Sequence, residues 1–321
     1  MGDGTKIEWS DATWQIITGC SVLSPGCSNC YAMKLAGTRL RHHPSRAGLT
    51  APSKAGPVWT GEVRFNEQWL DQPLKWARPR DIFVCAHGDL FHESVPDEWI
   101  DKVFAVMAIA SRHRFQVLTK RSARMRAAIA RMGKSIDILD RHARSLGYTL
   151  KYTVQPELAA AVRRHPGEVI GLVPWPLPNV YLGISAERQK EWDERKGDLA
   201  ATPAAVRFAS FEPLIGPIIE PRLLSDFLSW AIVGGESGAG ARPMHPAWPR
   251  SLRDQCAAAG VPFFFKQHGE WLCELGTGNY RPEPGDLVSC GDGHIARRVG
   301  KKAAGRLLDG VEHNGMPGDQ P

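Results

Sequence analysis

Three cysteines near the start of the chain, Cys20, Cys27 and Cys30, form a C-x6-C-x2-C motif. Thiolates are the usual ligands of iron–sulfur clusters, and three of them leave one iron of a [4Fe–4S] cluster open to a small molecule. A zinc site normally takes four protein ligands, or three and a water, and mixes Cys with His. Because no fourth Cys or His lies close by, the motif favours a [4Fe–4S] cluster over zinc.

The residues around these cysteines suit a tightly folded loop. Gly19 and Gly26 permit a positive φ, and Pro25 fixes its own φ. Two other interpretations stay open: half of a zinc site that is completed elsewhere, or a disulfide with one spare thiol. We recognise no signal peptide and no membrane span, so we expect a cytoplasmic protein whose thiols remain reduced, which argues against the disulfide.

The charge of the chain points to an acidic partner. The 321 residues carry a net charge of +6 and a pI near 9.0, so nucleic acid is the first candidate. For any single basic cluster, the solvated face of a helix is the favoured explanation. The clusters are Arg39 to His43, Lys120 to Arg131, Arg163 to His165, and Arg297 to Lys302.

Short β-rich segments alternate with helical ones along most of the chain. Such alternation predicts parallel strands joined by right-handed crossovers, and eight units predict an α/β fold, a (β/α)8 or irregular TIM-like barrel. An open doubly wound sheet is the alternative. The predicted strands are Thr13–Ile17, Glu62–Phe65, Ile82–Ala86, Phe115–Thr119, Val180–Ile184, Val206–Ala209, Trp230–Val233 and Pro262–Phe265.

We expect a single barrel domain over residues 1–267. Two segments rich in Pro and Gly, near 42–60 and 147–178, are predicted to be insertions. Residues 268–321 are predicted to form a C-terminal extension with a basic helix at Gly300–Leu308. The most regular helix is expected over Pro96 to Ala110, where apolar residues recur at helical spacing.

Polar residues follow the predicted strands, at the end of a barrel where catalytic residues usually lie. The turn from Gly234 to Gly238 can bring backbone N–H groups close to a ligand, because glycine has no Cβ. The carboxylate of Glu236, which lies in this turn, could accept hydrogen bonds from an ammonium group or a ribose. In the alternative interpretation Glu236 caps the following turn or pairs with Arg242.

Over nearly its whole length the chain resembles the phage-associated three-cysteine-motif family, whose function is unknown. More distantly it is similar to radical S-adenosylmethionine (SAM) enzymes such as spore photoproduct lyase. It departs from the commonest radical SAM pattern, because the first gap is six residues and Tyr31 follows the last cysteine. The matching stretches are Lys6 to Trp14, Thr18 to Ala32, Asp89 to Asp97, Phe115 to Arg121, Phe211 to Leu214, Val233 to His245, and Phe263 to Gln267.

This resemblance implies a barrel of the radical SAM type, a [4Fe–4S] cluster on the three cysteines, and SAM bound at its open iron. The expected function is modification or repair of nucleic acid or a nucleotide, with a protein partner also considered. One alternative is a zinc- or cluster-stabilised phage protein that binds nucleic acid without catalysis. A third is a metal-independent barrel enzyme that uses Glu212, Glu236 and Lys266 on a phosphorylated substrate. The candidate cofactor contacts are Asp89, Lys120, Ser185, Glu212, Gly234, Gly235 and Glu236.

Overall fold

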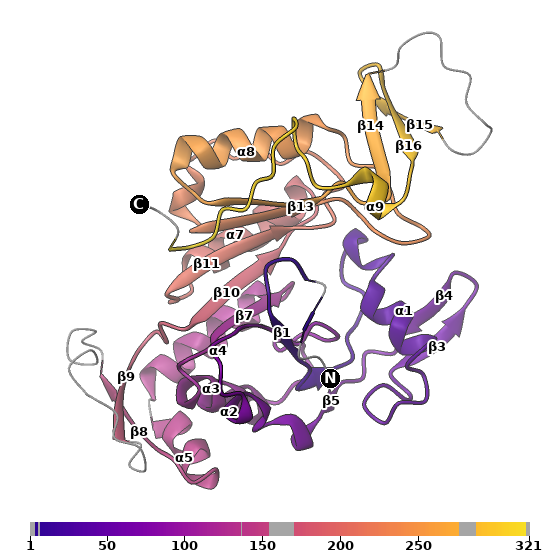
Figure 1. The fold of residues 1–321 in the computed structure, drawn as a ribbon. Coiled ribbons are helices and arrows are strands. Elements are labelled where there is room, and N and C mark those ends of the chain that lie inside the picture. Colours follow the sequence, from indigo (N-terminus) through magenta and orange to yellow (C-terminus); the bar gives the residue numbers. More distant parts are fainter. Residues whose placement is uncertain (1–3, 6, 136, 154–169, 276–286, 319–321) are drawn as a thin grey trace. The chain divides into compact units, whose positions relative to one another are not determined.

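A computed structural model describes residues 4–5, 7–135, 137–153, 170–275 and 287–318 (Figure 1). The chain divides into two compact units that alternate along the sequence. The first unit comprises Met1–Val22, Ala32–Gly183 and Ala201–Val206. The second unit comprises Leu23–Tyr31, Ile184–Ala200 and Arg207–Pro321. Residues 268–321 fall within the last segment of the second unit, Arg207–Pro321.

The largest sheet has seven strands in the order β1-β6-β7-β10-β11-β12-β13, so the strand order follows the chain. The pairs β1–β6, β6–β7, β11–β12 and β12–β13 are parallel, which confirms a mixed α/β fold with parallel pairing. The strands are β1 (Ala12–Trp14), β6 (Asp81–Val84), β7 (Arg114–Thr119), β10 (Val180–Ser185), β11 (Val206–Phe211), β12 (Trp230–Gly234) and β13 (Phe263–Gln267).

The second predicted strand, Glu62–Phe65, is not part of this sheet. Its last two residues form β5 (Arg64–Phe65), which pairs antiparallel with β2 (Ile17–Thr18). The predicted strand Thr13–Ile17 is divided between β1 and β2, because the Asn66 amide donates to two carbonyl oxygens of the intervening residues, at 3.0 and 3.2 Å. The described residues therefore give an open order of seven strands and not a closed eight-stranded barrel.

The first unit surrounds its strands with helices, of which α3 is the most deeply buried. The helix α3 (Asp97–Ile109) begins after Pro96, and its first turn carries two acidic residues that favour a helix N-terminus. The apolar spacing predicted for it is confirmed, since Ile100, Val103 and Phe104 are all buried. The other helices of this part are α1 (Tyr31–Gly37), α2 (Gln72–Lys75), η2 (Glu67–Trp69), α4 (Ser122–Lys134) and α5 (Asp137–Ser145).

Both predicted insertions contain strands. Residues 42–60 include an antiparallel hairpin of β3 (Thr50–Ser53) and β4 (Gly56–Trp59). In the segment 147–178, β8 (Thr149–Thr153) pairs parallel with β9 (Ile170–Pro174). The basic cluster at Arg163–His165 lies outside the described residues.

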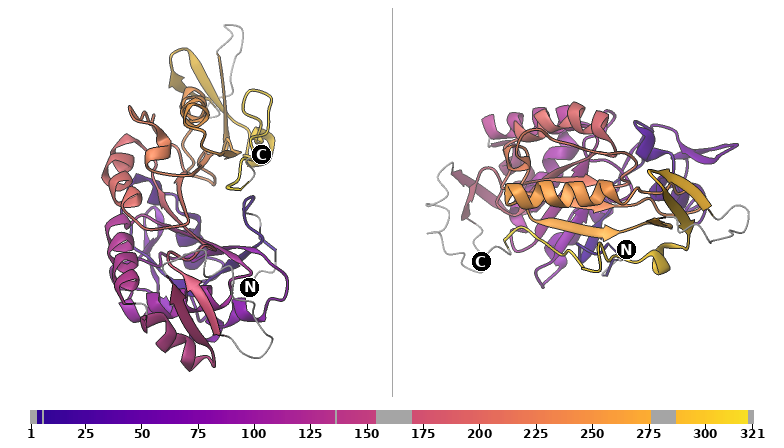
Figure 2. Two further views of the ribbon diagram at one scale, coloured as in Figure 1. Left: turned by 90° about the vertical axis from the view of Figure 1, so that its left-hand side faces the viewer. Right: turned by 90° about the horizontal axis from the view of Figure 1, so that it is seen from above.

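The helices of the second unit include η1 (Pro25–Cys27), α7 (Gln189–Ala200), η3 (Leu224–Asp226) and α8 (Ala247–Ala259). Of these, α8 packs on β12 and β13. Figure 1 and the right-hand view of Figure 2 show α8, in orange, running alongside β13. A three-stranded antiparallel sheet follows, in the order β14 (Trp271–Leu275), β16 (His294–Arg298), β15 (Leu287–Gly291). The predicted basic helix is shorter than expected, and α9 spans only Lys301–Ala304.

Within the described ranges, no helix combines the length and the apolar composition that crossing a membrane requires.

Candidate functional site

The three motif cysteines are divided between the two units. Cys20 belongs to the first unit, whereas Cys27 and Cys30 lie on the segment Leu23–Tyr31 of the second. All three are unbridged thiols.

The backbone at Cys20 is fixed by its neighbours in the first unit. Gly19 has a φ of +94°, and a Cβ at this position would lie 2.2 Å from the carbonyl oxygen of Glu62. Only glycine fits here, as expected for the tightly folded loop. The Gly19 N–H donates to the carbonyl oxygen of His87 at 3.1 Å, and the Gly61 N–H donates to that of Cys20 at 3.2 Å.

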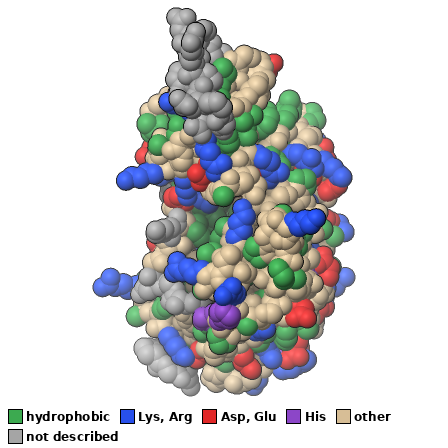
Figure 3. All heavy atoms as spheres, turned by 90° about the vertical axis from the view of Figure 1, so that its right-hand side faces the viewer, with side chains coloured by type: hydrophobic (Ala, Val, Ile, Leu, Met, Phe, Trp, Pro, Cys, Tyr) green, Lys and Arg blue, Asp and Glu red, His purple; other side chains and the backbone are tan. Residues whose placement is uncertain are grey.

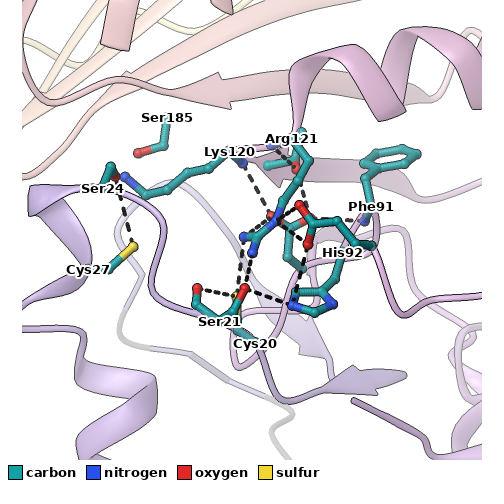
Figure 4. Close-up of polar contacts among 12 residues, drawn as sticks. Cys20, Ser21, Ser24, Cys27, Phe91, His92, Lys120, Arg121 and Ser185 are labelled. Atoms are coloured by element: carbon teal, nitrogen blue, oxygen red, sulfur yellow. Dashed lines mark hydrogen bonds and ion pairs between the residues drawn. The ribbon is translucent and has the colours of Figure 1, made fainter. Parts of the chain in front are cut away.

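The guanidinium of Arg121 connects Cys20 to two carboxylates (Figure 4). It donates to the Cys20 Sγ at 3.4 Å, to Asp89 Oδ2 at 3.2 Å and to Ser21 Oγ at 2.6 Å. Its Nε lies 3.3 Å from both oxygens of Glu93. Burial alone would lower the pKa of Arg121, but Asp89, Cys20 and Glu93 outweigh it and raise the pKa. A permanent positive charge beside a thiol favours the thiolate, which is the form that binds metals.

Asp89 organises this group of residues and is itself only 4 % exposed. Its carboxylate accepts hydrogen bonds from Thr119 Oγ1 at 2.7 Å and from the Phe91 N–H at 2.9 Å. The backbone N–H of Lys120 adds a third contact at 3.3 Å, beside the ion pair with Arg121. The structure thus brings Asp89 and Lys120 together with Cys20, and the carboxylate of Asp89 is used within the protein.

A buried histidine also lies in this group. His92 Nε2 is 3.0 Å from Ser21 Oγ, and the ring is 3 % exposed. Burial, with a contribution from Arg121, lowers the pKa of His92, so its imidazole is neutral at neutral pH. His92 and Ser21 both lie in stretches that match the family, but neither was singled out, because neither belongs to a recognised ligand spacing.

In the second unit, Glu187 holds the turn that precedes Cys27. The Gly26 N–H donates to Glu187 Oε1 at 2.7 Å, and Arg195 contacts Oε2 at 3.4 Å. Glu187 is fully buried, and Arg195 also donates to the carbonyl oxygen of Ser185 at 2.6 Å. The turn itself is the short helix η1, which begins at a proline. Sequence reasoning missed Glu187, although it lies only two residues beyond a predicted contact.

The other side of the segment is held through Arg242. Its guanidinium makes two contacts with Glu236, at 2.6 and 2.8 Å, and donates to the carbonyl oxygen of Pro25 at 2.9 Å. The hydrogen bonds that Arg242 donates to Glu236 raise the pKa of Arg242. Nearby, the Asn29 amide donates to the carbonyl oxygen of Gly240 at 2.6 Å. Glu236 thus pairs with Arg242, the alternative left open above, and acts on the cysteine segment through it.

The remaining predicted contacts of the second unit gather around Glu212. Lys266 Nζ lies 2.8 and 3.0 Å from its two carboxylate oxygens, and Gln267 Nε2 lies 3.4 Å from one of them. Ser185 Oγ donates to the carbonyl oxygen of Glu212 at 3.4 Å. A Cβ on Gly234 would lie 3.4 Å from the Glu212 Cδ, so this glycine stands directly beside the ion pair.

The glycine-rich turn is closely packed against other backbone. A Cβ on Gly235 would lie 2.0 Å from the carbonyl oxygen of His268. The Gly235 N–H donates to the carbonyl oxygen of Gln267, and the Gly238 N–H donates to Glu270 Oε1 at 2.9 Å. Both N–H groups are therefore used inside the second unit. Gly235 serves close packing of the chain, whereas Gly238 adopts a φ of +100°.

Two of the other four cysteines are deeply buried, as predicted. Burial raises the pKa of Cys85 and that of Cys256 to about 12, so both thiols stay protonated. Cys273 and Cys290 are only partly buried. Across the described ranges, no group of three or more His, Cys, Asp and Glu side chains is already gathered for a metal ion.

The basic cluster on α4 is largely neutralised by α3. Arg124 pairs with Asp97 at 3.0 Å, and Arg131 pairs with Asp101 at 2.6 Å. Figure 3 shows Lys and Arg side chains spread over one face, with Asp and Glu among them. The cluster at 120–131 is therefore a less basic surface than its sequence suggests.

Comparison with known proteins gives one match. A family described as "Protein of unknown function (DUF5131)" matches residues 4–317. Searches among curated proteins and among solved structures found no match. Over nearly its whole length, the chain therefore belongs to this family, DUF5131, whose description assigns no function.

Proposed function

We propose that this protein is an iron–sulfur enzyme of the radical SAM kind that modifies or repairs nucleic acid or a nucleotide. In this proposal Cys20, Cys27 and Cys30 hold a [4Fe–4S] cluster, and SAM binds beside it. The observation that carries the proposal is a set of three unbridged thiols within eleven residues, the first of which receives an arginine hydrogen bond. The sequential strand order is what an irregular, incomplete barrel would have.

The donor set and its surroundings fit such a cluster. Three thiolates are the ligands that a [4Fe–4S] cluster with one open iron requires. Arg121 supplies positive charge at Cys20, while Glu187 and Arg242 hold the backbone before Cys27. Outer hydrogen bonds of this kind orient metal ligands and tune the metal. Support therefore comes from the chemistry of the donors and from the contacts that position Cys20 and the backbone before Cys27.

When bound, the cluster would supply one electron to cleave SAM, and the protein positions the reactants. Arg121 keeps the Cys20 thiolate oriented and balances its charge. The pair of Glu236 and Arg242 keeps the cysteine segment in place. The ion pair of Glu212 with Lys266, beside Ser185, offers charged and polar groups to the amino acid part of SAM.

Anaerobic purification with iron and sulfide analysis tests this proposal. We expect about four irons and four sulfides per chain, because that is the cluster's composition. Cys20→Ala, Cys27→Ala and Cys30→Ala should each lose the cluster, since no other ligand replaces the missing thiolate. Cys256→Ala is the matched control, because this thiol is a single buried one on α8, and it should keep full iron content.

A reaction assay separates the remaining alternatives. With a strong reductant and SAM, the wild-type protein should form 5′-deoxyadenosine, and the three cysteine variants should not. A colourless protein that contains zinc would instead support a non-catalytic protein that binds nucleic acid. Activity on a phosphorylated substrate that survives loss of all three cysteines would favour a metal-independent enzyme built on Glu212, Glu236 and Lys266.

A further inference from the structure

A second pair of cysteines lies in the small antiparallel sheet of the second unit. Cys273 is on β14 and Cys290 is on β15, and their Sγ atoms are 2.6 Å apart. A disulfide bond is about 2.05 Å long, so the two sulfurs stand within about half an ångström of bonding distance. The residues are 17 positions apart in the sequence, which is why their spacing gave no signal of a pair.

The fold explains how two strands that do not pair directly bring their sulfurs together. Both β14 and β15 pair with β16, where Ala296 lies opposite Cys273 and opposite Val288. Ala296 has a small side chain and is fully buried, so it leaves space above the central strand. The register of β15 shifts between Ser289 and Gly291, at Cys290, and such an irregularity re-aims a side chain.

The environment of the pair is apolar but within reach of solvent. Cys273 and Cys290 pack against a cluster formed by Ala241, Trp271 and Ala296. Burial and the neighbouring thiol raise the pKa of Cys273. The thiol form is therefore stable until an oxidant arrives. Both residues remain partly exposed, so a small molecule can reach them.

We propose that Cys273 and Cys290 are a redox-active dithiol that forms a reversible intramolecular disulfide. The oxidant is a small-molecule disulfide. One cysteine thiolate attacks it, forming a mixed disulfide and releasing one small thiolate; the second cysteine then displaces the other. The two cysteines give up two protons and two electrons, and the small disulfide is reduced to two thiols. This site uses neither Cys20 nor Cys27 nor Cys30, so it is independent of the proposed cluster.

The bond would act on residues that hold the cysteine segment. Trp271 Nε1 donates to the carbonyl oxygen of Ala241 at 2.7 Å, and Arg298 donates to that of Gly238 at 2.9 Å. Ala241 directly precedes Arg242, which contacts Pro25. The state of the dithiol is thus linked through contacts of one compact unit to the turn before Cys27.

Peptide mapping of the full-length protein tests this proposal directly. The reduced protein is incubated with oxidised glutathione, the remaining thiols are alkylated, and the peptides are identified by mass spectrometry. We expect the peptides of Cys273 and Cys290 to appear joined, about 2 Da lighter than their sum because two hydrogens are lost. Re-reduction should separate them. Because this measurement uses the wild-type chain, it does not depend on any variant folding.

Three variants sharpen the result. Cys273→Ser and Cys290→Ser should each prevent the cross-link and leave a glutathione adduct on the remaining cysteine. Cys256→Ala should cross-link like the wild type. If both thiols remain fully alkylatable after oxidation, the proposal is overturned. It is equally overturned if zinc copurifies with the protein and is lost from Cys273→Ser and Cys290→Ser, because the pair would then be a metal ligand.

Discussion

Arg121 forms ion pairs with two carboxylates, one buried and one exposed. The contributions of a buried and an exposed ion pair to stability can therefore be compared at the same guanidinium. The Asp89 side chain is 6 % exposed and that of Glu93 is 62 % exposed. Removing the buried partner leaves a buried charge uncompensated, so Asp89→Asn should lower the free energy of unfolding by about 3 kcal/mol. Glu93→Gln should lower it by less than about 1 kcal/mol, because water already solvates that pair.

Urea denaturation followed by circular dichroism measures both effects on matched samples. A difference of less than about 1 kcal/mol between Asp89→Asn and Glu93→Gln would show that Asp89 does not organise the surroundings of Cys20. The comparison is robust because both variants remove one negative charge next to the same guanidinium.

Glu236 and Glu191 form a second matched pair of carboxylates. Each is nearly buried and each pairs with a partly exposed arginine, Arg242 and Arg188 respectively. Only Arg242 also contacts the cysteine segment, at Pro25. Glu236→Gln should therefore loosen that segment and speed alkylation of the metal-free Cys27 thiol by about tenfold, the effect of about 1.4 kcal/mol in local stability.

Mass spectrometry of the peptide that contains Cys27, sampled over time with an alkylating agent, gives the rate. Glu191→Gln should leave the rate unchanged. Equal rates in both variants would mean that Arg242 does not hold the segment through Glu236.

At this scale the sequence predicted the polar residues, but of their partners only Arg242, which was one alternative for Glu236. Asp89, Glu212 and Glu236 were expected at strand ends, and each is found beside a basic residue. Glu187 could not be predicted, because its contact with Gly26 joins residues 161 positions apart. Such a pairing depends on which segments the fold brings together, and it cannot be predicted from local composition.

Two glycines show how the elements constrain their residues. A Cβ on Gly235 would clash with the carbonyl oxygen of His268, whereas one on Gly197 would meet nothing within 4 Å. Gly235→Ala must shift backbone, and we expect a loss of about 3 kcal/mol in unfolding free energy. Gly197→Ala lies within α7, where alanine is the better helix former, and should gain up to about 1 kcal/mol.

Thermal unfolding of the two variants provides the measurement, with opposite signs expected for the shift in midpoint. A stable Gly235→Ala protein would imply that the junction after β12 tolerates displacement, and a less stable Gly197→Ala would contradict the open surroundings of that residue.

Most strands were predicted because their apolar runs are bounded by turns. The strand Glu62–Phe65 was assigned to the wrong sheet, because a short alternation of apolar residues does not indicate which strand it pairs with. Phe65 stacks on Trp99, with ring centroids 5.2 Å apart, and so packs its ring without joining the large sheet. The division of Thr13–Ile17 depends on the Asn66 amide, a contact 50 positions away that no local pattern contains.

The charge of the whole molecule makes a prediction about nucleic acid. If phosphate contacts drive binding, affinity for an oligonucleotide should fall linearly on a log–log salt plot. With about four contacts it should drop by about a hundredfold between 50 and 200 mM salt. We expect so few contacts because two arginines of α4, Arg124 and Arg131, are already paired with α3.

Fluorescence anisotropy at several salt concentrations tests this, with a mononucleotide as the comparison ligand. If the protein does not bind the oligonucleotide at low salt, or if its affinity does not depend on salt, nucleic acid is excluded as a partner. A nucleotide would then be the better candidate for the substrate.

Because the segments of the two units alternate along the chain, the order of synthesis determines when each segment meets its partners. The segment Leu23–Tyr31 leaves the ribosome early, yet its contact at Arg242 comes 217 residues after Pro25. At translation rates of about 5 to 20 residues per second, the segment waits about 10 to 40 s for that partner. During this interval the motif thiols are carried on a nascent chain. Loading of the proposed cluster would therefore belong to the end of synthesis, and a truncated chain that ends before Gly240 lacks both Gly240 and Arg242, the partners of Asn29 and Pro25.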